Sequence, residues 1–442
     1  MTPANSLQTW LERLEAIHPK EIDLGLDRIR AVAERLALLP QLNQKNRKPF
    51  IFTVAGTNGK GSTCAMIDSL LQAHGVSTGR YGSPHFVDFN ERILVNNDPV
   101  SEDHIVAAFE AIDEARQDIS LTYFEFATLA ALHLFRQFDV SAWILEVGLG
   151  GRLDATNIVD ADVAVVTSIG LDHQDWLGDD ITQIGREKAG IFRPQQWAVC
   201  GQEDQVEGVV EVAQTLNAKL LHRGEHFHQT LQPQGNTWTW QGQSAQGDKV
   251  QLRDLPQPNL PLMNAATALQ AISLGPWPLA PEKIVSALGK VQLTGRFQTV
   301  QWHNQQLILD VAHNPQAAAH LAEKIVGAHL LVGMLNDKDI QGTLAALAKS
   351  QPKSWSFVDI PGPRGLTASA LAEALDRVMA VEQGNDSAPV ATVESTQFES
   401  VAAALESHKK TQNEVASKAP LVVCGSFLTV ADALTYLKLV TA

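Results

Sequence analysis

One stretch decides the fold: FIFTVAGTNGKGST, residues 50–63. It consists of an apolar strand, a glycine-rich loop and the start of a helix, because residues 66–71 continue it with apolar side chains on one helical face. In this order, loop N–H groups and the helix N-terminus can bind an anion, and Lys60 can reach the β- and γ-phosphates of a nucleotide. Only two residues separate Gly56 from Gly59, so the loop is a variant of the GxxxxGKS spacing. We predict that it binds ATP; a glycine turn that only reverses the chain is the alternative.

Short apolar runs recur downstream of this strand. They cover residues 143–147, 163–167 and 198–200, and the segments between them are long enough for a crossover helix. This alternation predicts an α/β fold with a doubly wound, mostly parallel sheet. Residues 225–253 break the rhythm with an alternating stretch at 237–240, which predicts an inserted β-hairpin whose two tryptophans pack across strands.

A second series of apolar runs lies in the C-terminal third of the chain. These runs again alternate with helical patterns, and they cover residues 307–311, 330–332, 356–360 and 421–424. They predict a smaller, Rossmann-like α/β domain. We therefore expect a phosphate-loop domain over residues 1–297 and a C-terminal domain over residues 298–442.

The composition excludes several classes of function. The chain carries 34 Lys and Arg against 49 Asp and Glu, a formal net charge of −15, which argues against extended contact with nucleic-acid phosphates or anionic lipid. No apolar run approaches the roughly 18 residues of a membrane span. The 3 cysteines lack CxxC spacing, so neither a disulfide framework nor a zinc site is indicated, and we expect a cytoplasmic protein.

Polar side chains follow the apolar runs of the first domain, at the edge where parallel strands end. Glu146 lies near the end of the run at 143–147 and is a candidate Mg²⁺ ligand. His173 follows the next run, and Ser83 in a separate turn could complete an oxygen-rich site. Each of these residues alone is more typical of a structural role or an ordinary turn. Together with the phosphate loop they favour a metal site.

Further polar candidates lie in the second domain and in the helix-end motif at 185–192. Asp310 and His313 lie at and just beyond the end of the first apolar run of that domain, and Arg296 at the domain boundary could reach a phosphate. Several such strand ends in one domain suggest a binding cleft at the carboxyl edge of its sheet. The charged residues of the motif, Lys188 among them, are by themselves typical of a solvated cluster at a helix end.

The motifs taken together resemble those of one family, the folylpolyglutamate synthases, which are members of the Mur ligase superfamily. The resemblance spans nearly the whole chain and rests on GTNGKGS at 56–62, SPH at 83–85, EVGLGGRLDATN at 146–157, GLDH at 170–173, REKAGI at 186–191, LTGRFQ at 293–298, DVAHNP at 310–315, GMLNDKD at 333–339 and GSF at 425–427. The segments at 22–26, 121–125 and 172–178 resemble the bacterial branch of the family that also joins the first glutamate to dihydropteroate.

The resemblance implies a set of site residues. By that resemblance ATP meets Thr57, Asn58, Gly59, Lys60, Asn264, Arg296 and Asp310. Two Mg²⁺ ions are held by Ser83, Glu146, His173 and Lys188, the last as a carbamate that turns a cation into an oxygen ligand. The pterin substrate is bound by Asp23, Leu24, Gly25, Leu26, Thr122, Tyr123, Phe124, Glu125, Leu153, Asp154 and Ala155.

The activity that the resemblance implies is ATP-dependent amide ligation through an acyl phosphate. The catalytic candidates are Lys60, Lys188, Asp310 and His313, of which the last two would position L-glutamate. We expect only small-molecule partners (dihydropteroate, reduced folates, L-glutamate and ATP), no nucleic acid, no membrane and a monomer. The alternatives are a folylpolyglutamate synthase without the first activity, a peptidoglycan-precursor ligase of the Mur type, and a P-loop ATPase without ligation. The segments at 23–26 and 122–125 disfavour the peptidoglycan enzyme.

Overall fold

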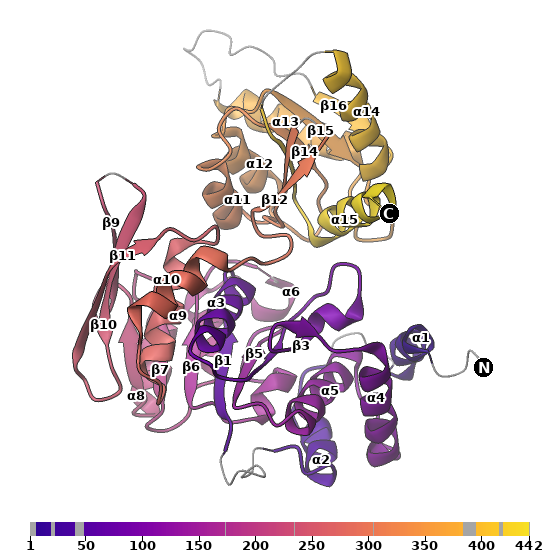
Figure 1. Cartoon of the computed structure of the whole chain (residues 1–442). Helices are drawn as coiled ribbons and strands as arrows, with labels where there is room; N and C mark the ends of the chain where they lie inside the picture. The colour runs from indigo at the N-terminus through magenta and orange to yellow at the C-terminus, as the bar shows by residue number, and fades with distance from the viewer. Residues whose placement is uncertain are drawn as a thin grey trace. The chain divides into compact units, whose positions relative to one another are not determined.

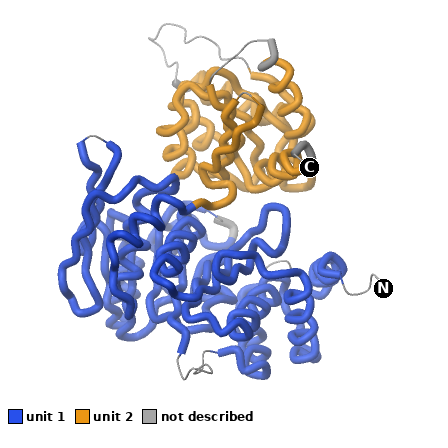
Figure 2. The backbone as a smooth tube through the Cα atoms, in the orientation of Figure 1, with its two compact units in different colours: residues 1–291 blue, residues 292–442 orange. Residues whose placement is uncertain are grey.

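The computed structural model divides the chain into two compact units (Figure 2). Unit 1 comprises residues 1–291 and unit 2 comprises residues 292–442, so the division lies before the boundary expected at 297. The residues that the structure describes are 6–18, 23–39, 48–172, 174–233, 235–303, 305–382, 395–414 and 419–441.

Unit 1 is built on an eight-stranded sheet in the order β4-β3-β2-β5-β1-β6-β7-β8. The strands are β1 (Phe50–Ala55), β2 (Thr78–Tyr81), β3 (Ile93–Val95), β4 (Asp98–Pro99), β5 (Ala142–Glu146), β6 (Val163–Val166), β7 (Trp197–Cys200) and β8 (Lys219–His222). All pairs from β2 to β8 in this order are parallel, and β3 and β4 extend one edge in antiparallel fashion. The predicted mostly parallel sheet is therefore confirmed.

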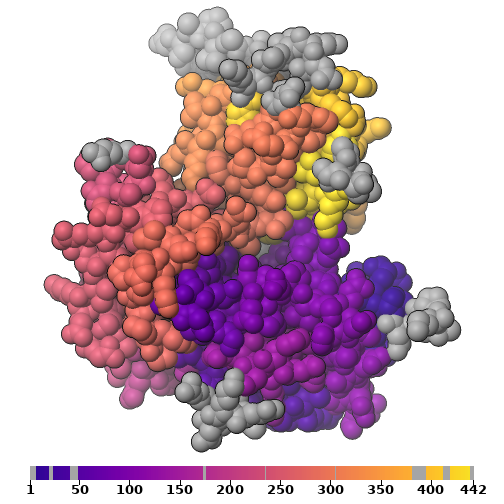
Figure 3. All heavy atoms as spheres, viewed as in Figure 1, coloured from indigo at the N-terminus to yellow at the C-terminus, as the bar shows by residue number. Residues whose placement is uncertain are grey.

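Helices cover both faces of this sheet (Figure 1). They are α1 (Leu7–Ile17), α2 (Asp27–Arg35), α3 (Lys60–Ala73), α4 (Glu102–Arg116), α5 (Tyr123–Gln137), α6 (Gln174–Leu177), α7 (Ile181–Ala189), α8 (Glu207–Thr215), α9 (Leu262–Ser273) and α10 (Pro281–Lys290), with 3₁₀ turns η2 (Phe89–Arg92) and η3 (Ala155–Ile158). Helices α3, α9 and α10 pack together on one face, where α10 and α3 lie side by side at the surface (Figure 3).

Side chains of the central strands alternate between the two faces, as the pleat requires. Ile51, Trp143 and Leu145 point into a core that they share with α4 and α5. Ala164 and Ala198 lie in a neighbouring core with α7 and α8. The sheet is thus doubly wound, and its strand ends are held rigidly between two helical layers.

The predicted hairpin insertion is a three-stranded antiparallel sheet, one strand larger than expected. Its strands are β9 (His228–Leu231), β10 (Thr237–Gln243) and β11 (Lys249–Pro256), with β10 in the middle. Trp238 and Trp240 on β10 are fully buried, and their indole N–H groups donate to the carbonyls of Pro256 (3.0 Å) and Ala266 (3.1 Å). The tryptophans therefore pack the insertion, and Trp240 fastens it to α9.

Unit 2 is a smaller α/β domain, as predicted. Its six strands run in the order β12-β13-β17-β14-β15-β16, and only the β12–β13 pair is antiparallel. The strands are β12 (Gln298–Trp302), β13 (Gln305–Leu309), β14 (His329–Val332), β15 (Ser354–Val358), β16 (Ser395–Phe398) and β17 (Leu421–Cys424). The helices are α11 (Pro315–Ala322), α12 (Ile340–Ala348), α13 (Ala368–Glu382), α14 (Val401–Glu414) and α15 (Phe427–Thr441).

The cysteines and the helices were checked for two features, reactive thiols and membrane spans. Cys64, Cys200 and Cys424 are free and buried. Burial raises the pKa of all three thiols, that of Cys200 to about 11, so none is a thiolate nucleophile at neutral pH. None of the helices within the described ranges is long and apolar enough to cross a membrane.

Candidate active site

The glycine loop of unit 1 connects β1 to α3 in a conformation that only glycine tolerates at two positions. Gly56 has φ +148°, and a Cβ atom there would lie 1.9 Å from the hydroxyl of Thr167. Gly59 has φ +88°, and a Cβ atom there would lie 2.6 Å from Oδ1 of Asn264 on α9. The loop is therefore packed against two neighbouring elements. The close approach also brings Asn264, which is 6% exposed, beside the N-terminus of α3.

The carboxyl end of β6 fixes the rest of the loop. The backbone N–H groups of Thr57 and Asn58 donate to the carbonyl (2.7 Å) and hydroxyl (3.1 Å) of Ser168. The Thr57 hydroxyl donates to the Gly170 carbonyl and accepts from the Gly170 N–H, both at 3.0 Å. Thr167 donates to the carbonyl of Asn58 at 2.7 Å. These hydrogen bonds hold the loop in a single conformation, as a preorganised anion site requires.

Two lysines meet at one carbonyl of the loop. Lys60 at the start of α3 donates to the carbonyls of Gly56 (3.0 Å) and Thr57 (3.3 Å). Lys188 on α7 donates to the same Gly56 carbonyl at 3.1 Å. Burial, with a smaller contribution from the Lys60 charge, lowers the pKa of Lys188 to about 7. Near neutral pH a large fraction of Lys188 is therefore an uncharged amine.

The expectation of a solvated charge cluster is wrong for Lys188. Its neighbours Arg186 and Glu187 fit that expectation better: Arg186 pairs with Glu211 at the surface, and Glu187 pairs with the exposed Arg152. Lys188 itself is 4% exposed. The reason is tertiary: the loop at Gly151 packs so closely on α7 that a Cβ atom there would lie 2.8 Å from the carbonyl of Lys188.

Two of the four expected metal ligands lie at the carboxyl ends of adjacent strands, β2 and β5. Glu146 ends β5 and is 8% exposed, and half-buried Ser83 follows β2 by two residues. A Cβ atom at Gly82 would lie 2.9 Å from Oε2 of Glu146, so the glycine leaves room at that carboxylate. His173 lies outside the described residues. Within the described ranges, no three His, Cys, Asp or Glu side chains converge into a metal-binding group.

The segment 122–125 forms the N-terminus of α5. Thr122 caps the helix, and the Glu125 carboxylate accepts from the Thr122 N–H at 2.8 Å in a capping box. Tyr123 lies under the Arg92 guanidinium, 5.4 Å from its ring centre. Phe124 packs on Gly148 after β5, where a Cβ atom would be 2.7 Å from the ring. Two aromatic rings, one buried carboxylate and the strand end of β5 are thus brought together.

The segment 23–26 lies at the start of α2, beside this helix N-terminus. Asp23 is half-buried and pairs with Arg28 at 2.7 Å. Leu26 packs on the core shared by α4 and α5, whereas Leu24 and Gly25 are half-buried. Two of the three segments that were expected to bind the pterin, 23–26 and 122–125, are therefore neighbours in unit 1.

The loop at 148–157 contains the third expected pterin segment, residues 153–155. The buried Asp154 carboxylate accepts from the N–H groups of Gly148 and Leu149 (3.0 Å each) and from the N–H (3.0 Å) and hydroxyl (2.7 Å) of Thr156. Its side chain thus shapes the loop. Leu153 is half-buried and Ala155 is 5% exposed, so little of Ala155 can be contacted from solvent.

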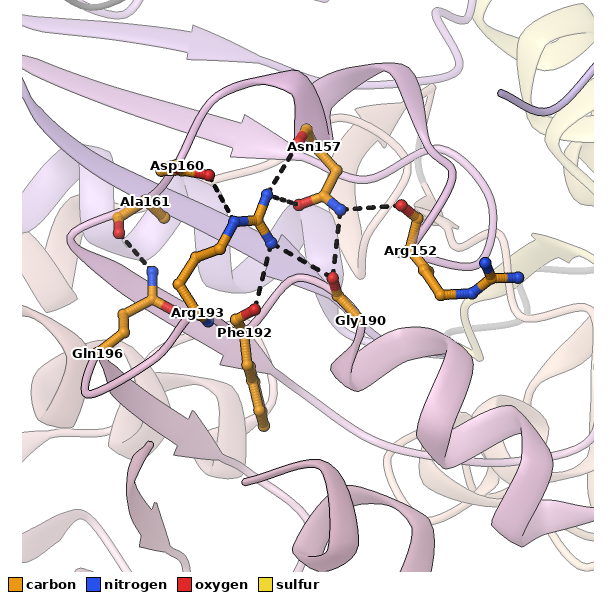
Figure 4. A network of polar contacts seen from close by, with 8 residues as sticks. All are labelled: Arg152, Asn157, Asp160, Ala161, Gly190, Phe192, Arg193 and Gln196. Atoms are coloured by element: carbon orange, nitrogen blue, oxygen red, sulfur yellow. Dashed lines mark hydrogen bonds and ion pairs between the residues drawn. The ribbon is translucent and has the colours of Figure 1, made fainter. Parts of the chain in front are cut away.

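A polar network joins this loop to the helix that carries Lys188 (Figure 4). The Arg193 guanidinium donates to the carbonyl and side-chain oxygens of Asn157 (3.0 Å each) and to the carbonyls of Gly190 and Phe192, and it pairs with Asp160. Asn157 in turn donates to the Gly190 carbonyl at 3.2 Å. The network caps the end of α7 and fixes its position relative to the expected substrate loop.

Replacing Arg193 with methionine is expected to lower the free energy of unfolding by about 2 kcal/mol, because several charge-assisted hydrogen bonds are lost together. The matched control is Arg186→Met, which removes only the exposed pair with Glu211 and should leave the free energy of unfolding close to that of the wild type. Urea unfolding followed by circular dichroism measures both. Equal stabilities of the two variants would contradict the role given to the network.

Unit 2 gathers its expected residues around the end of β13. The Asp310 carboxylate accepts from the N–H groups of Phe297 (2.8 Å) and Ala312 (2.9 Å), and burial raises its pKa. The Arg296 guanidinium lies 4.8 Å from the ring centre of Phe427, and the His313 ring lies 6.1 Å from the same ring. The side chains of Arg296 and His313 are thus brought together by one aromatic ring at the start of α15.

Four residues that contact the expected site residues or fix their loops, three in unit 1 and one in unit 2, are missing from the sequence prediction. Ser168 and Arg193 fix loops through contacts with distant segments, and Arg28 joins Asp23 to Glu125. Phe427 was noted only as part of the GSF motif. A partial signal existed for Ser168 and Phe427, because both follow apolar strands. No local pattern marks Arg28 or Arg193.

Comparison with known proteins gives consistent matches over the chain. Residues 54–255 match the family model of the Mur ligase middle domain, and residues 295–427 match that of the Mur ligase glutamate ligase domain. The dihydrofolate synthase/folylpolyglutamate synthase of Escherichia coli is 44% identical over 97% of this chain and 94% of its own length.

Solved structures match equally well. The E. coli FolC structure in complex with DHPP and ADP has a TM-score of 0.87 at 43% identity and covers 100% of both chains. The bifunctional folylpolyglutamate synthase/dihydrofolate synthase of Yersinia pestis, complexed with AMPPNP and a Mn ion, has a TM-score of 0.85 at 44% identity, with 99% of this chain and 100% of that chain covered.

Proposed function

The chain belongs to the folylpolyglutamate synthase family of Mur ligases, and from this premise we propose that it is an ATP-dependent amide ligase with two substrates. It joins L-glutamate to dihydropteroate, forming dihydrofolate, and to tetrahydrofolate, forming folylpolyglutamates. ATP is the co-substrate, and ADP and phosphate are the other products. One observation carries the proposal: the similarity to a relative named for both activities extends over 97% of the chain.

The reaction consists of two transfers. A carboxylate oxygen of the pterin substrate attacks the γ-phosphorus of ATP, giving an acyl phosphate and ADP. The amine of L-glutamate then attacks the acyl carbon, loses a proton, and displaces phosphate as the amide forms. Little covalent chemistry is left for the protein, so it acts by positioning and by stabilising charge.

The chain's own groups supply that stabilisation in unit 1. We assign the phosphates to the N-terminus of α3 and to Lys60. The N–H groups of Thr57 and Asn58 already donate to Ser168, so the loop keeps its shape without the nucleotide. Asn264, which lies against Gly59, is proposed to meet the nucleotide. This preorganisation is what an electrostatic site needs, since little reorganisation remains for the moment of transfer.

The residues present fit Mg²⁺, a hard cation that prefers oxygen ligands. Ser83, Glu146, His173 and a carbamylated Lys188 would hold it, in up to two sites. The Lys188 amine has the buried setting and the lowered pKa that let it react with CO₂ as an uncharged nucleophile. When bound, Mg²⁺ supplies neutralisation of charge on the transferring phosphoryl group.

In unit 2, Arg296 and Asp310 are proposed to contact the nucleotide. Asp310 and His313 are proposed to position L-glutamate. The His313 ring is oriented by a hydrogen bond between its Nδ1 and the Val311 carbonyl at 2.8 Å. A cytoplasmic location and a monomeric state complete the proposal.

One assay tests the function. The purified protein is incubated with ATP, Mg²⁺, L-glutamate and either dihydropteroate or tetrahydrofolate, and ADP and the glutamyl product are measured by mass spectrometry. We expect a new glutamyl amide with each pterin, one ADP per amide. A product with tetrahydrofolate alone would identify the enzyme that only extends folates. ADP formation without any amide would exclude a ligase.

A further inference from the structure

A single arginine joins two of the segments, 23–26 and 122–125, that the family resemblance assigns to the pterin. Arg28 lies in the first turn of α2, and its Nη1 is 2.7 Å from Oδ2 of Asp23. Its Nη2 donates to the backbone carbonyl of Asp23 at 2.7 Å and lies 3.3 Å from Oε1 of Glu125 on α5. One guanidinium thus reaches the side chain and backbone of one segment and the carboxylate of the other.

The Glu125 carboxylate depends on this arginine. Its side chain is 4% exposed, and burial raises its pKa. One oxygen accepts from the Thr122 N–H in the helix cap, whereas the other, Oε1, accepts no hydrogen bond from any described residue. Arg28 is therefore the cation that stabilises the ionised form at Oε1.

The arginine in turn has few other constraints. Its side chain is 30% exposed, and its Nε is enclosed without a hydrogen-bond partner among the described residues. Its contacts there are with Asp23 and Glu125, and His18 Nε2 lies 3.6 Å from the same Oδ2 of Asp23 that Arg28 contacts. The direction of the guanidinium is therefore set by the two carboxylates that it connects.

These contacts assign Arg28 a role that no motif gave it. We propose that Arg28 is a positioning residue for the dihydropteroate reaction, which holds segment 23–26 against the N-terminus of α5 so that the pterin site is assembled before substrate arrives. The inference rests on the proposed function. Arg28 would affect binding of the pterin rather than phosphoryl transfer, because within the described residues it contacts neither the phosphate loop nor Lys188.

The test compares Arg28→Met and Arg28→Lys with the control Arg35→Met. Arg35 lies on the same helix and donates to the carbonyls of Ala115 (2.8 Å) and Arg116 (3.1 Å), so its loss also weakens the attachment of α2 but leaves both carboxylates paired. In Arg28→Met we expect KM for dihydropteroate to rise by about tenfold or more, while kcat and KM for ATP change by less than about threefold. Arg28→Lys should recover part of this loss, and Arg35→Met should keep the wild-type KM.

Equilibrium dialysis of dihydropteroate without ATP, and thermal unfolding, are measured on the same variants. Weaker dihydropteroate binding by folded Arg28→Met supports the proposal even if that variant turns over too slowly for kinetics. The proposal is overturned if Arg28→Met binds dihydropteroate like the wild type, or if Arg35→Met weakens binding equally. A wild-type protein that makes no amide would instead refute the proposed function, so the two failures are distinguishable.

Discussion

Replacing Lys60 with methionine is expected to lower the rate of ADP formation by about 10³-fold, the scale on which removing one charge-stabilising donor acts. Lys60 stands at the N-terminus of α3, and its ammonium already lies at the loop, bonded to the carbonyls of Gly56 and Thr57. Methionine keeps the length and much of the volume of the side chain but removes the charge. The loop itself remains held by Ser168 and Thr167.

The measurement is steady-state ADP release with saturating L-glutamate and dihydropteroate. Lys283→Met on the exposed face of α10 serves as the control for loss of a lysine, and it should match the wild type. Thermal unfolding shows whether each variant is folded. Wild-type kcat in a folded Lys60→Met protein would remove this lysine from the phosphoryl transfer.

Replacing Lys188 with alanine is expected to lower kcat by at least about 10²-fold, because the proposed carbamate is both a metal ligand and a negative charge beside the phosphates. Short-chain carboxylates such as acetate should restore part of the activity, since they bring oxygen ligands into the space that the side chain leaves. The measurement is kcat against acetate concentration, with chloride at equal ionic strength as the control. Unchanged activity of Lys188→Ala would refute the carbamate.

The lowered pKa of Lys188 also makes the stability of the unmodified protein depend on pH. Unmodified Lys188 has a pKa of about 7 in the fold and 10.5 in the unfolded chain, so between these values the unfolded chain holds the additional proton. Stability of the unmodified protein therefore rises with pH through this window, and below pH 7 the whole penalty for burying the ammonium remains. In bicarbonate-free buffer Lys188→Met should be the more stable protein at pH 6, and its advantage should vanish towards pH 10. An advantage that does not depend on pH would contradict the burial of a charged lysine.

The sequence predicted those parts of the fold and site that depend on local pattern. The phosphate loop is an example, because strand, glycines and helix follow one another within residues 50–63. The strand ends at Glu146 and Asp310 are further examples, since an apolar run followed by a carboxylate can be recognised from adjacent residues alone. The short strands β2, β3, β4, β8, β12 and β16 were not predicted, because such short stretches give no clear apolar run.

Local sequence pattern could not predict the contacts between segments that are distant in the chain. Lys188 is buried because the loop at Gly151 packs on its helix, and a charged triplet in sequence shows nothing of that approach. Arg28 and Arg193 have partners far along the chain, so their neighbours in sequence do not reveal their roles. The conformation of Gly59, by contrast, could be anticipated, since the strand-to-helix turn around an anion favours glycine.

The central claim is ligation through an acyl phosphate, and transfer of an oxygen isotope tests it most directly. Dihydropteroate carrying ¹⁸O in both carboxylate oxygens is converted with unlabelled ATP and L-glutamate, and the phosphate released is examined by mass spectrometry. Attack of the carboxylate on the γ-phosphorus predicts that one ¹⁸O atom appears in phosphate for each amide formed, while the other stays in the amide carbonyl. Unlabelled phosphate, or ¹⁸O in AMP, would contradict the mechanism.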